Sequence, residues 1–388
     1  MTGIRSIAIL AGLLLLAACE STGRPAGEET VVRVATFNIR ELSGEKLDRR
    51  GDDGRFDHPQ LLNAAAIIRR VRPDVLLVNE IDFDAERREN ARLFVERFLR
   101  SERPGLEPLD YPEIFFEPVN TGEPSGRDLD KDGASDGPAD AHGFGRYPGQ
   151  YGMAILSRFP IDREGARTFR HLRWAAMPGA RLPDGRDGRP AFYDAGDREI
   201  LRLSSKSHWD VPVLVGGHRL HVLASHPTPP VFDGPEDRNG RRNADEIRFW
   251  ADHLSGGAVA GYIVDDEGRS GGLAPEASFV VLGDLNADPH GVRVGNGPAI
   301  AALLEHPRVR DPRPRGAGGV EVSRPYEGEA AEQTSDYGRL DYVLPSRDLV
   351  IEGSGVFWPR AADPEGGLMH GDDAASDHAL VWVDFRFD

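Results

Sequence analysis

Short apolar segments rich in β-branched residues recur along this chain, and they constrain its fold more than any other feature. Such segments favour strands, because branched side chains pack well on a pleated sheet. Three stretches instead carry apolar residues at helical spacing, over 59–70, 87–100 and 244–254, and Asn243 is placed to cap the last. Strands joined by few helices indicate an α+β sandwich. We expect strands over 31–40, 74–81, 151–157, 201–207, 218–225, 278–286, 339–346 and 379–387.

Isolated polar residues stand where these apolar runs give way to loops. A carboxylate in such a place is costly to remove from water unless it binds a metal, a partner or a substrate. One such residue indicates little, but its repetition at strand after strand predicts one shared cleft. The residues are Asn38, Glu80, His226, Asp284, Asn286, Asp341, Asp377 and His378.

These side chains suit the hydrolysis of a phosphate ester. A hard divalent cation such as Mg²⁺ prefers carboxylate oxygens, and it neutralises charge on phosphoryl oxygens and on the leaving group. A carboxylate can orient or deprotonate the attacking water, and amides and protonated imidazoles can stabilise the charge that develops on phosphorus. The spacing G-x-S-x-G occurs in the loops 133–137 and 268–272 but not at a strand-to-helix elbow, and an H-E-x-x-H zinc motif is absent from the sequence.

The motifs FN, NE, G.AILSR, SHP, GDLN, RLDYV and SDH occur in this order between about residues 31 and 387. Together they resemble the endonuclease/exonuclease/phosphatase superfamily, which includes deoxyribonucleases, abasic-site endonucleases, sphingomyelinases and inositol-polyphosphate 5-phosphatases. One departure is Asn79, where the family often has Gln. The resemblance implies one domain over 31–388, folded as a four-layer α/β/β/α sandwich of two mixed, mostly antiparallel sheets flanked by helices.

The same resemblance implies a role for each motif residue. Glu80 would be the principal ligand of Mg²⁺ or Mn²⁺, with Asn38 beside it. Asp284 would orient or deprotonate water, Asn286 would bind the phosphate, and His378 would stabilise the transition state. The remaining assignments are Asp377 in the metal or water network, His226 on the leaving-group side, and Asp341 as partner of a catalytic histidine.

Basic residues near these motifs are candidate substrate contacts. Segment 204–210 falls where relatives carry a basic phosphate contact, a role open to Lys206 or His208, although this segment also suits a surface loop. Segment 228–243 holds three arginines, which can bind further phosphates or carboxylates in bidentate fashion or else pair with nearby acidic residues. These three are Arg238, Arg241 and Arg242.

An acidic loop predicts a second cation site. Its spacing, D-x-D-x-D-G-x-x-D, matches the start of a calcium loop, but position 12 is Ala139 rather than Glu and no EF-hand helices flank it. We expect Ca²⁺ in loop 128–139, and the alternative is a solvated acidic linker. The carboxylates are Asp128, Asp130, Asp132 and Asp136, and the loop lies in one of three expected insertions near 118–149, 162–199 and 255–277.

The N-terminus resembles a bacterial lipoprotein signal. The apolar stretch 7–18 is too short for a typical membrane span and ends at Cys19, the only cysteine. We expect a signal peptide over 1–18, lipidation of Cys19 as the link to a membrane, and a flexible tether over 19–30. Glu20 is not the aspartate that retains such proteins at the inner membrane. This favours an outer-membrane location in the cell envelope, with a secreted protein as the alternative.

The net charge of −17 bears on the substrate. An acidic chain without a basic stripe repels polyanions, so a small or compact phosphate ester is favoured over nucleic acid. A secreted nuclease remains an alternative. A third possibility, of another class, is a calcium-stabilised surface binding module without activity. We expect a monomer.

Overall fold

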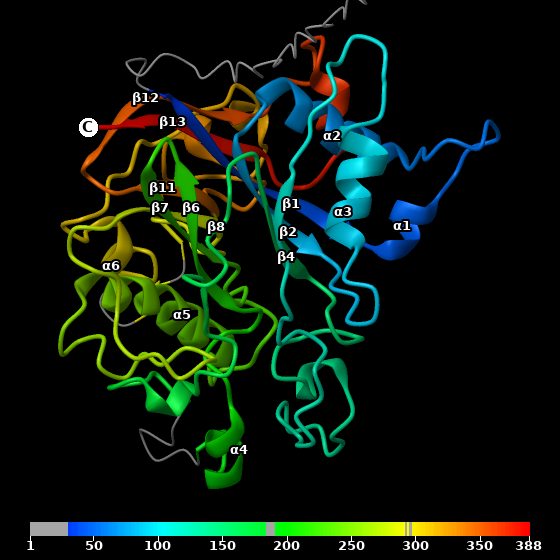
Figure 1. Ribbon diagram of the computed structural model, residues 1–388. Coiled ribbons are helices and arrows are strands. Elements are labelled where there is room, and N and C mark those ends of the chain that lie inside the picture. Colours follow the sequence, from blue (N-terminus) through cyan, green and yellow to red (C-terminus); the bar gives the residue numbers. More distant parts are fainter. Residues whose placement is uncertain (1–29, 184–190, 292, 295–296) are drawn as a thin grey trace, which may run out of the picture.

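The computed structural model describes residues 30–183, 191–291, 293–294 and 297–388, and within them two β-sheets face each other (Figure 1). The predicted signal peptide and Cys19 lie outside the described residues. No helix within the described part of the chain has both the length and the apolar character needed to cross a membrane.

The first sheet has six strands and a single parallel pair, β1 with β2. Its other neighbours are antiparallel. In spatial order the strands are β12 (Leu349–Phe357), β13 (Leu380–Phe387), β1 (Val32–Leu42), β2 (Val75–Ile81), β4 (Gly152–Ser157) and β3 (Glu113–Phe115).

The second sheet has five strands and again one parallel pair, β7 with β8. Its order is β11 (Asp341–Pro345), β8 (Ser278–Asp284), β7 (His218–Ser225), β6 (His208–Val215) and β5 (Arg167–Thr168). A separate two-stranded ribbon pairs β9 (Arg293–Val294) with β10 (Gly297–Pro298).

Helices cover the outer faces of both sheets (Figure 1). On the first sheet lie α2 (Pro59–Val71) and α3 (Asn90–Phe94), which continues as a π-helical turn over Val95–Leu99. The long α5 (Arg238–Ser255) covers the second sheet. The short helices are α1 (Gly44–Asp48), α4 (Ala195–Ile200) and α6 (Ala301–Leu304). The predicted four-layer sandwich of mixed, mostly antiparallel sheets is therefore confirmed.

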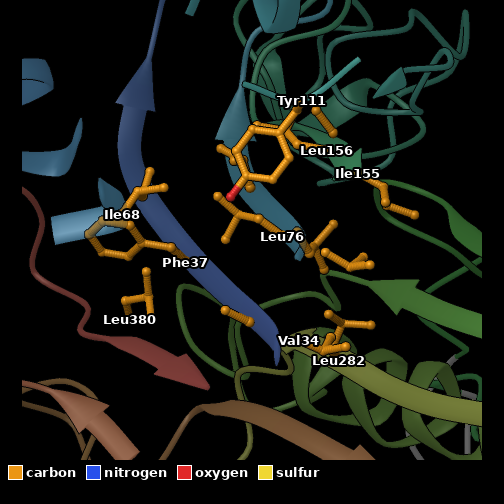
Figure 2. Close-up of a cluster of buried hydrophobic side chains, with 14 of the residues drawn as sticks. Val34, Phe37, Ile68, Leu76, Tyr111, Ile155, Leu156, Leu282 and Leu380 are labelled. Atoms are coloured by element: carbon orange, nitrogen blue, oxygen red, sulfur yellow. The ribbon is translucent and has the colours of Figure 1, made fainter. Parts of the chain in front are cut away.

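Strand β8 shows how the layers are held together. Val280 and Leu282 point into the core shared with the first sheet, whereas Phe279 and Val281 join the cluster beneath α5. This alternation follows from the two-residue period of a strand. Figure 2 shows Leu282 in one apolar cluster with Val34 of β1.

Two sequence expectations were wrong. Segment 201–207 is not a strand; the strand is β6, which starts at His208 and includes Pro212. Proline lacks an N–H for a ladder, but β5 ends before Pro212, and the segment beside it there uses only the Pro212 carbonyl, which accepts from Asp162 N at 2.9 Å. The helix expected from Asn243 begins earlier, at Arg238. Asn243 is therefore not its cap, and its side chain instead donates to the carbonyls of Thr228 and Leu285.

Candidate active site

One amide joins the two sheets at the centre of the site. Asn38, near the end of β1, donates from Nδ2 to Oε1 of Glu80 at 3.1 Å and to Oδ2 of Asp284 at 3.0 Å. Asn38 and Asp284 are both 1 % exposed. A carboxylate from each sheet is thus held against the same side chain, as expected for residues at the ends of adjacent strands.

Two of the predicted residues adopt left-handed backbone conformations. Glu80 has φ +64° where the register of β2 shifts, and Asn286 has φ +50° just after β8. Such conformations cost of order 1–3 kcal/mol for a residue with a side chain and concentrate at functional sites. In β2 the bulge turns the Glu80 carboxylate towards Asn38, and a backbone bond from Glu41 N to Oε2, 3.0 Å, fixes it there.

A histidine–aspartate pair lies beside Asp284. Nδ1 of His378 is 2.8 Å from Oδ2 of Asp341, and its Nε2 is 3.7 Å from Oδ2 of Asp284. Burial alone would lower the pKa of His378, but the charges of Asp341 and Asp284 raise that pKa well above its usual range. His378 is therefore an imidazolium with one N–H directed towards Asp284.

The second histidine differs in charge. Nε2 of His226 is 3.5 Å from the same Asp284 oxygen. Burial, together with the nearby Lys206 and His378 cations, lowers the pKa of His226 well below its usual range, so this ring is neutral. Burial raises the pKa of Asp284 to about 6, against the opposing effect of His378. One carboxylate oxygen thus faces one neutral and one charged imidazole.

Lys206 is the one predicted basic contact that reaches this centre. It is 6 % exposed, and its Nζ donates to no acceptor within the described part of the chain. Burial lowers the pKa of Lys206, while Glu246, Glu80 and Asp284 oppose that change. A buried ammonium group without a hydrogen-bond acceptor, beside the two central carboxylates, is suited to bind an anionic oxygen of a substrate.

The other basic candidates are engaged elsewhere. His208 is 1 % exposed, bonds to the Glu246 carbonyl at 2.9 Å and packs on Phe249 and Trp250, so it belongs to the core under α5. Arg242 donates to four backbone carbonyls, including Leu203 O at 3.0 Å. His208 and Arg242 were predicted as substrate contacts, but their side chains are bonded within the protein interior.

The remaining two arginines also differ from each other. Arg238 pairs with Glu236 and lies over the ring of Phe192. Arg241 forms no ion pair with any described residue, and its Nε is buried without a partner. Of the three arginines in 228–243, Arg241 is the one whose side chain remains available to a ligand.

The metal site fits Glu80 and Asn38 better than Asp377. The Oδ1 atom of Asn38 is buried and has no hydrogen-bond partner among the described residues, so this acceptor is free for a cation next to Glu80. Asp377 is exposed and accepts a bond from Ser376 at 3.3 Å. Asp284, Asp341 and His378 form a second group with ligand atoms within 4.8 Å of one another, in which His378 already bonds to Asp341.

The acidic loop contains a different cluster from the predicted one. Asp128, Asp130 and Asp140 bring carboxylate oxygens within 4.8 Å of one another, whereas Asp132 and Asp136 are exposed and outside the group. Asp140 is held by the backbone N–H groups of Leu129 and Gly137. The EF-hand-like spacing therefore identified two of the three clustered residues.

Sequence reasoning missed two residues that hold the site. Glu246 accepts from Ser205 N at 2.6 Å and from Thr228 N at 2.7 Å, which ties the loops of Lys206 and His226 to α5. Thr334 donates to Oδ2 of Asp341 at 2.7 Å. A signal existed for Glu246, since it lies four residues before Trp250 and so shares the buried face of the predicted helix.

Comparison with known families settles the class of this site. The model of the endonuclease/exonuclease/phosphatase family matches residues 35–378, nearly the whole described chain. The chain belongs to this family. It is accordingly a hydrolase that acts on phosphoester bonds, in a family that depends on divalent metals.

The chain is similar to several solved structures. An endonuclease/exonuclease/phosphatase from Beutenbergia cavernae has a TM-score of 0.50 and 19 % identity, over 92 % of this chain and 72 % of that one. A second from Bacteroides vulgatus has a TM-score of 0.48 and 12 % identity, over 93 % and 100 %. The human Nocturnin catalytic domain, with bound sulfate, has a TM-score of 0.47 and 15 % identity, over 92 % of this chain and 95 % of that one. No curated protein matches the sequence.

Proposed function

We propose that this protein hydrolyses a small or compact phosphate ester outside the cytoplasm, with Asp284 activating water. The observation that carries the proposal is the surrounding of Asp284 Oδ2, which accepts from Asn38 at 3.0 Å and faces His226 at 3.5 Å and His378 at 3.7 Å. A carboxylate so enclosed can hold a water and receive its proton.

Glu80 and Asn38 would hold the divalent cation, Mg²⁺ or Mn²⁺. Oxygen ligands of this kind suit hard cations, and the free Oδ1 of Asn38 supplies an acceptor beside the Glu80 carboxylate. The bound cation would neutralise charge on the phosphoryl oxygens. Exposed Asp377 would reach it only through water.

The cationic side chains would bind the phosphoryl group. His378 would donate its Nε2 proton in a hydrogen bond to a phosphoryl oxygen, and buried Lys206 would pair with another. Asn286 is fixed by a bond from its Nδ2 to Pro227 O at 3.1 Å, which leaves its side-chain carbonyl oxygen and second amide proton for substrate or water. Neutral His226 would stay on the leaving-group side as a hydrogen-bond donor.

Two features support a compact substrate. The net charge of −17 repels extended polyanions, and of the five basic candidates only Lys206 and Arg241 remain free to contact a ligand. Duplex-binding proteins instead present many basic contacts to successive phosphates. A secreted nuclease is the second candidate, because family members include nucleases. A binding module without activity would not need the assembled site around Asp284.

Calcium would bind the acidic loop at Asp128, Asp130 and Asp140. Their oxygens lie within 4.8 Å of one another, and Oδ1 of Asp128 is buried without a hydrogen-bond partner among the described residues. The loop belongs to segment 118–149, so this ion would stabilise an insertion rather than take part in catalysis.

Lipidation of Cys19 would place the domain in the cell envelope, with the outer membrane favoured. The proposal rests on the sequence around Cys19. Labelled palmitate should be incorporated by the full-length chain and not by Cys19→Ser. Equal labelling of both would contradict it.

The proposed substrate class is tested with residues 20–388. Hydrolysis of a chromogenic phosphate monoester, a chromogenic diester and supercoiled plasmid should be followed with Mg²⁺ or Mn²⁺, with and without chelator. We expect chelator-sensitive cleavage of the small esters and little nicking, all lost in Asp284→Asn. Rapid nicking would favour the nuclease, and inactivity on all three would favour the binding module.

A further inference from the structure

A groove of about 620 Å³ is lined by Ser376 and Asp377, the two residues that precede His378. Its walls come from three segments far apart in sequence, which include Arg40 in β1, Arg324 and Tyr337 before β11, and Ser376 with Asp377 before β13. Of these residues, only Asp377 has a role in the phosphoester hydrolysis proposed above.

Backbone and side-chain contacts join the groove to the candidate active site. Ser335 forms a β-bridge with His378, and the neighbouring Thr334 bonds to Asp341. Tyr337 is two residues further along the same tight turn. On the opposite wall, Arg40 lies two residues after Asn38, and its backbone N–H donates to Ser376 Oγ at 3.4 Å. A phosphoryl group bound by His378, next to a cation at Asn38, would therefore have this groove beside it.

The groove offers a flat ring and two guanidinium groups. Tyr337 is 67 % exposed, and the guanidinium of Arg324 lies 5.0 Å from the centre of its ring. Neither Arg324 nor Arg40 forms an ion pair with any described residue. The floor is apolar, since Trp358 and Met369 line it with little exposure. Exposed aromatic rings and free guanidinium planes bind heteroaromatic bases by stacking.

The charge of the groove limits the size of its ligand. Four carboxylates line it beside the two arginines, so its overall field does not attract a long polyanion. The acidic residues are Glu321, Asp336, Asp372 and Asp377. A single flat group, with acceptor atoms for one or two guanidinium groups, matches this lining better than a chain of phosphates does.

We propose that this groove binds the organic group of the substrate, and that Tyr337 and Arg324 select a heteroaromatic group, as in the ester of a single nucleotide. This inference rests on the proposed phosphoesterase function and names the substrate class for the same site. Tyr337 would stack on the ring, and Arg324 and Arg40 would donate to its acceptor atoms.

The test compares two diesters that share a leaving group: the p-nitrophenyl ester of thymidine 5′-monophosphate, and methyl p-nitrophenyl phosphate. The wild-type enzyme should show the higher kcat/KM for the nucleotide ester. Tyr337→Leu and Arg324→Ala should each lower that kcat/KM by roughly 5- to 100-fold, mainly through KM, because a stacked base contributes on this scale. Hydrolysis of the methyl ester should not change.

Two further variants sharpen the result. Tyr337→Phe keeps the ring and should retain the preference, and Phe232→Ala, at an 89 % exposed residue outside the groove, should change neither substrate. Equal kcat/KM for both esters in the wild type, or equal losses for both in Tyr337→Leu, would overturn the inference and leave the phosphoesterase function standing. If the wild type hydrolyses neither diester, this inference fails, whereas the proposed function fails only if the chromogenic monoester is not hydrolysed either.

Discussion

Asp341 accepts hydrogen bonds from His378 and from Thr334 on the same oxygen, at 2.8 and 2.7 Å. This shared oxygen fixes the orientation of the His378 ring and keeps Nε2 directed towards Asp284, 3.7 Å away. The hydroxyl of Thr334 also accepts from the backbone of Leu340 and Asp341, so the carboxylate has little freedom to turn. The pair is thus a rigid support for an imidazolium.

Replacing Asp341 by Asn should change both the charge and the rate. Asp341 is the largest influence that raises the pKa of His378, so its neutralisation should lower that pKa. Activity should fall by roughly 10²- to 10⁴-fold, as is typical when a histidine loses its orienting carboxylate. NMR titration of the metal-free protein measures the pKa. Asp348→Asn, exposed in the turn between β11 and β12, is the control. An unchanged His378 titration in Asp341→Asn would refute the assignment.

Glu246→Gln should weaken the connection between α5 and the two catalytic loops. An amide can accept from only one of the N–H groups of Ser205 and Thr228, so the other is left buried without a partner. A loss of about 1–3 kcal/mol in the free energy of unfolding is expected. Phosphoester hydrolysis should fall as well, because Lys206 and His226 lie in these loops. Urea unfolding against Asp252→Asn, on the more exposed side of α5, measures the effect; equal stabilities would show that Glu246 does not tie the loops.

A buried network away from the active site should control acid stability. Asp210 bonds to Nδ1 of His221 at 2.6 Å and to Nε2 of His253 at 3.1 Å. Burial would raise the pKa of Asp210, but these bonds outweigh it and lower that pKa. A carboxyl group with a lowered folded-state pKa stabilises the fold above its unfolded-state pKa, near 3.9. That stabilisation is lost as the pH falls through the folded-state pKa.

Asp210→Asn should therefore cost about 1–3 kcal/mol at pH 7, the usual effect of removing a charged acceptor from buried hydrogen bonds. The difference from the wild type should shrink in strongly acidic solution, where both chains lack the charge. Urea unfolding at several pH values measures this, with exposed Asp53→Asn as the control. A constant difference across the pH range would mean that the charge of Asp210 is not what stabilises the network.

Calcium should stabilise the wild-type chain and have less effect on Asp130→Asn. A ligand at 100 times its Kd adds about 2.7 kcal/mol to the stability of the form that binds it. The melting temperature should rise with Ca²⁺, and segment 120–148 should become resistant to protease. Asp136→Asn, outside the cluster, should respond like the wild type. No response to Ca²⁺ in the wild type would leave the loop as a solvated acidic segment.

The sequence predicted the parts of the site that follow from strand geometry. Asn38, Glu80, Asp284, Asp341 and His378 stand at or beside the ends of strands with strong apolar patterns, so the sandwich brings them together. The sequence pattern does not predict the positive φ of Glu80. That conformation belongs to a bulge in β2, and a bulge depends on how the neighbouring strands pair.

The sequence pattern did not predict contacts that depend on how the chain folds back on itself. Asp140 joins Asp128 because the backbone of Leu129 and Gly137 orients it, which residue spacing does not reveal. His208 resembles a substrate contact by its place in the sequence, yet the unpredicted strand β6 starts there and buries it beneath α5. Pro212 concealed that strand, since proline usually argues against one.

The dependence of diester hydrolysis on Mg²⁺ concentration, in the wild type and in Glu80→Gln, tests the central claim most directly. Glu80 supplies the charged oxygens beside the free Oδ1 of Asn38, so its neutralisation should raise the Mg²⁺ concentration for half-maximal rate by at least about 10-fold. The wild-type rate should vanish with chelator. Identical Mg²⁺ curves for the two proteins, or chelator-resistant hydrolysis, would contradict a catalytic metal at Glu80.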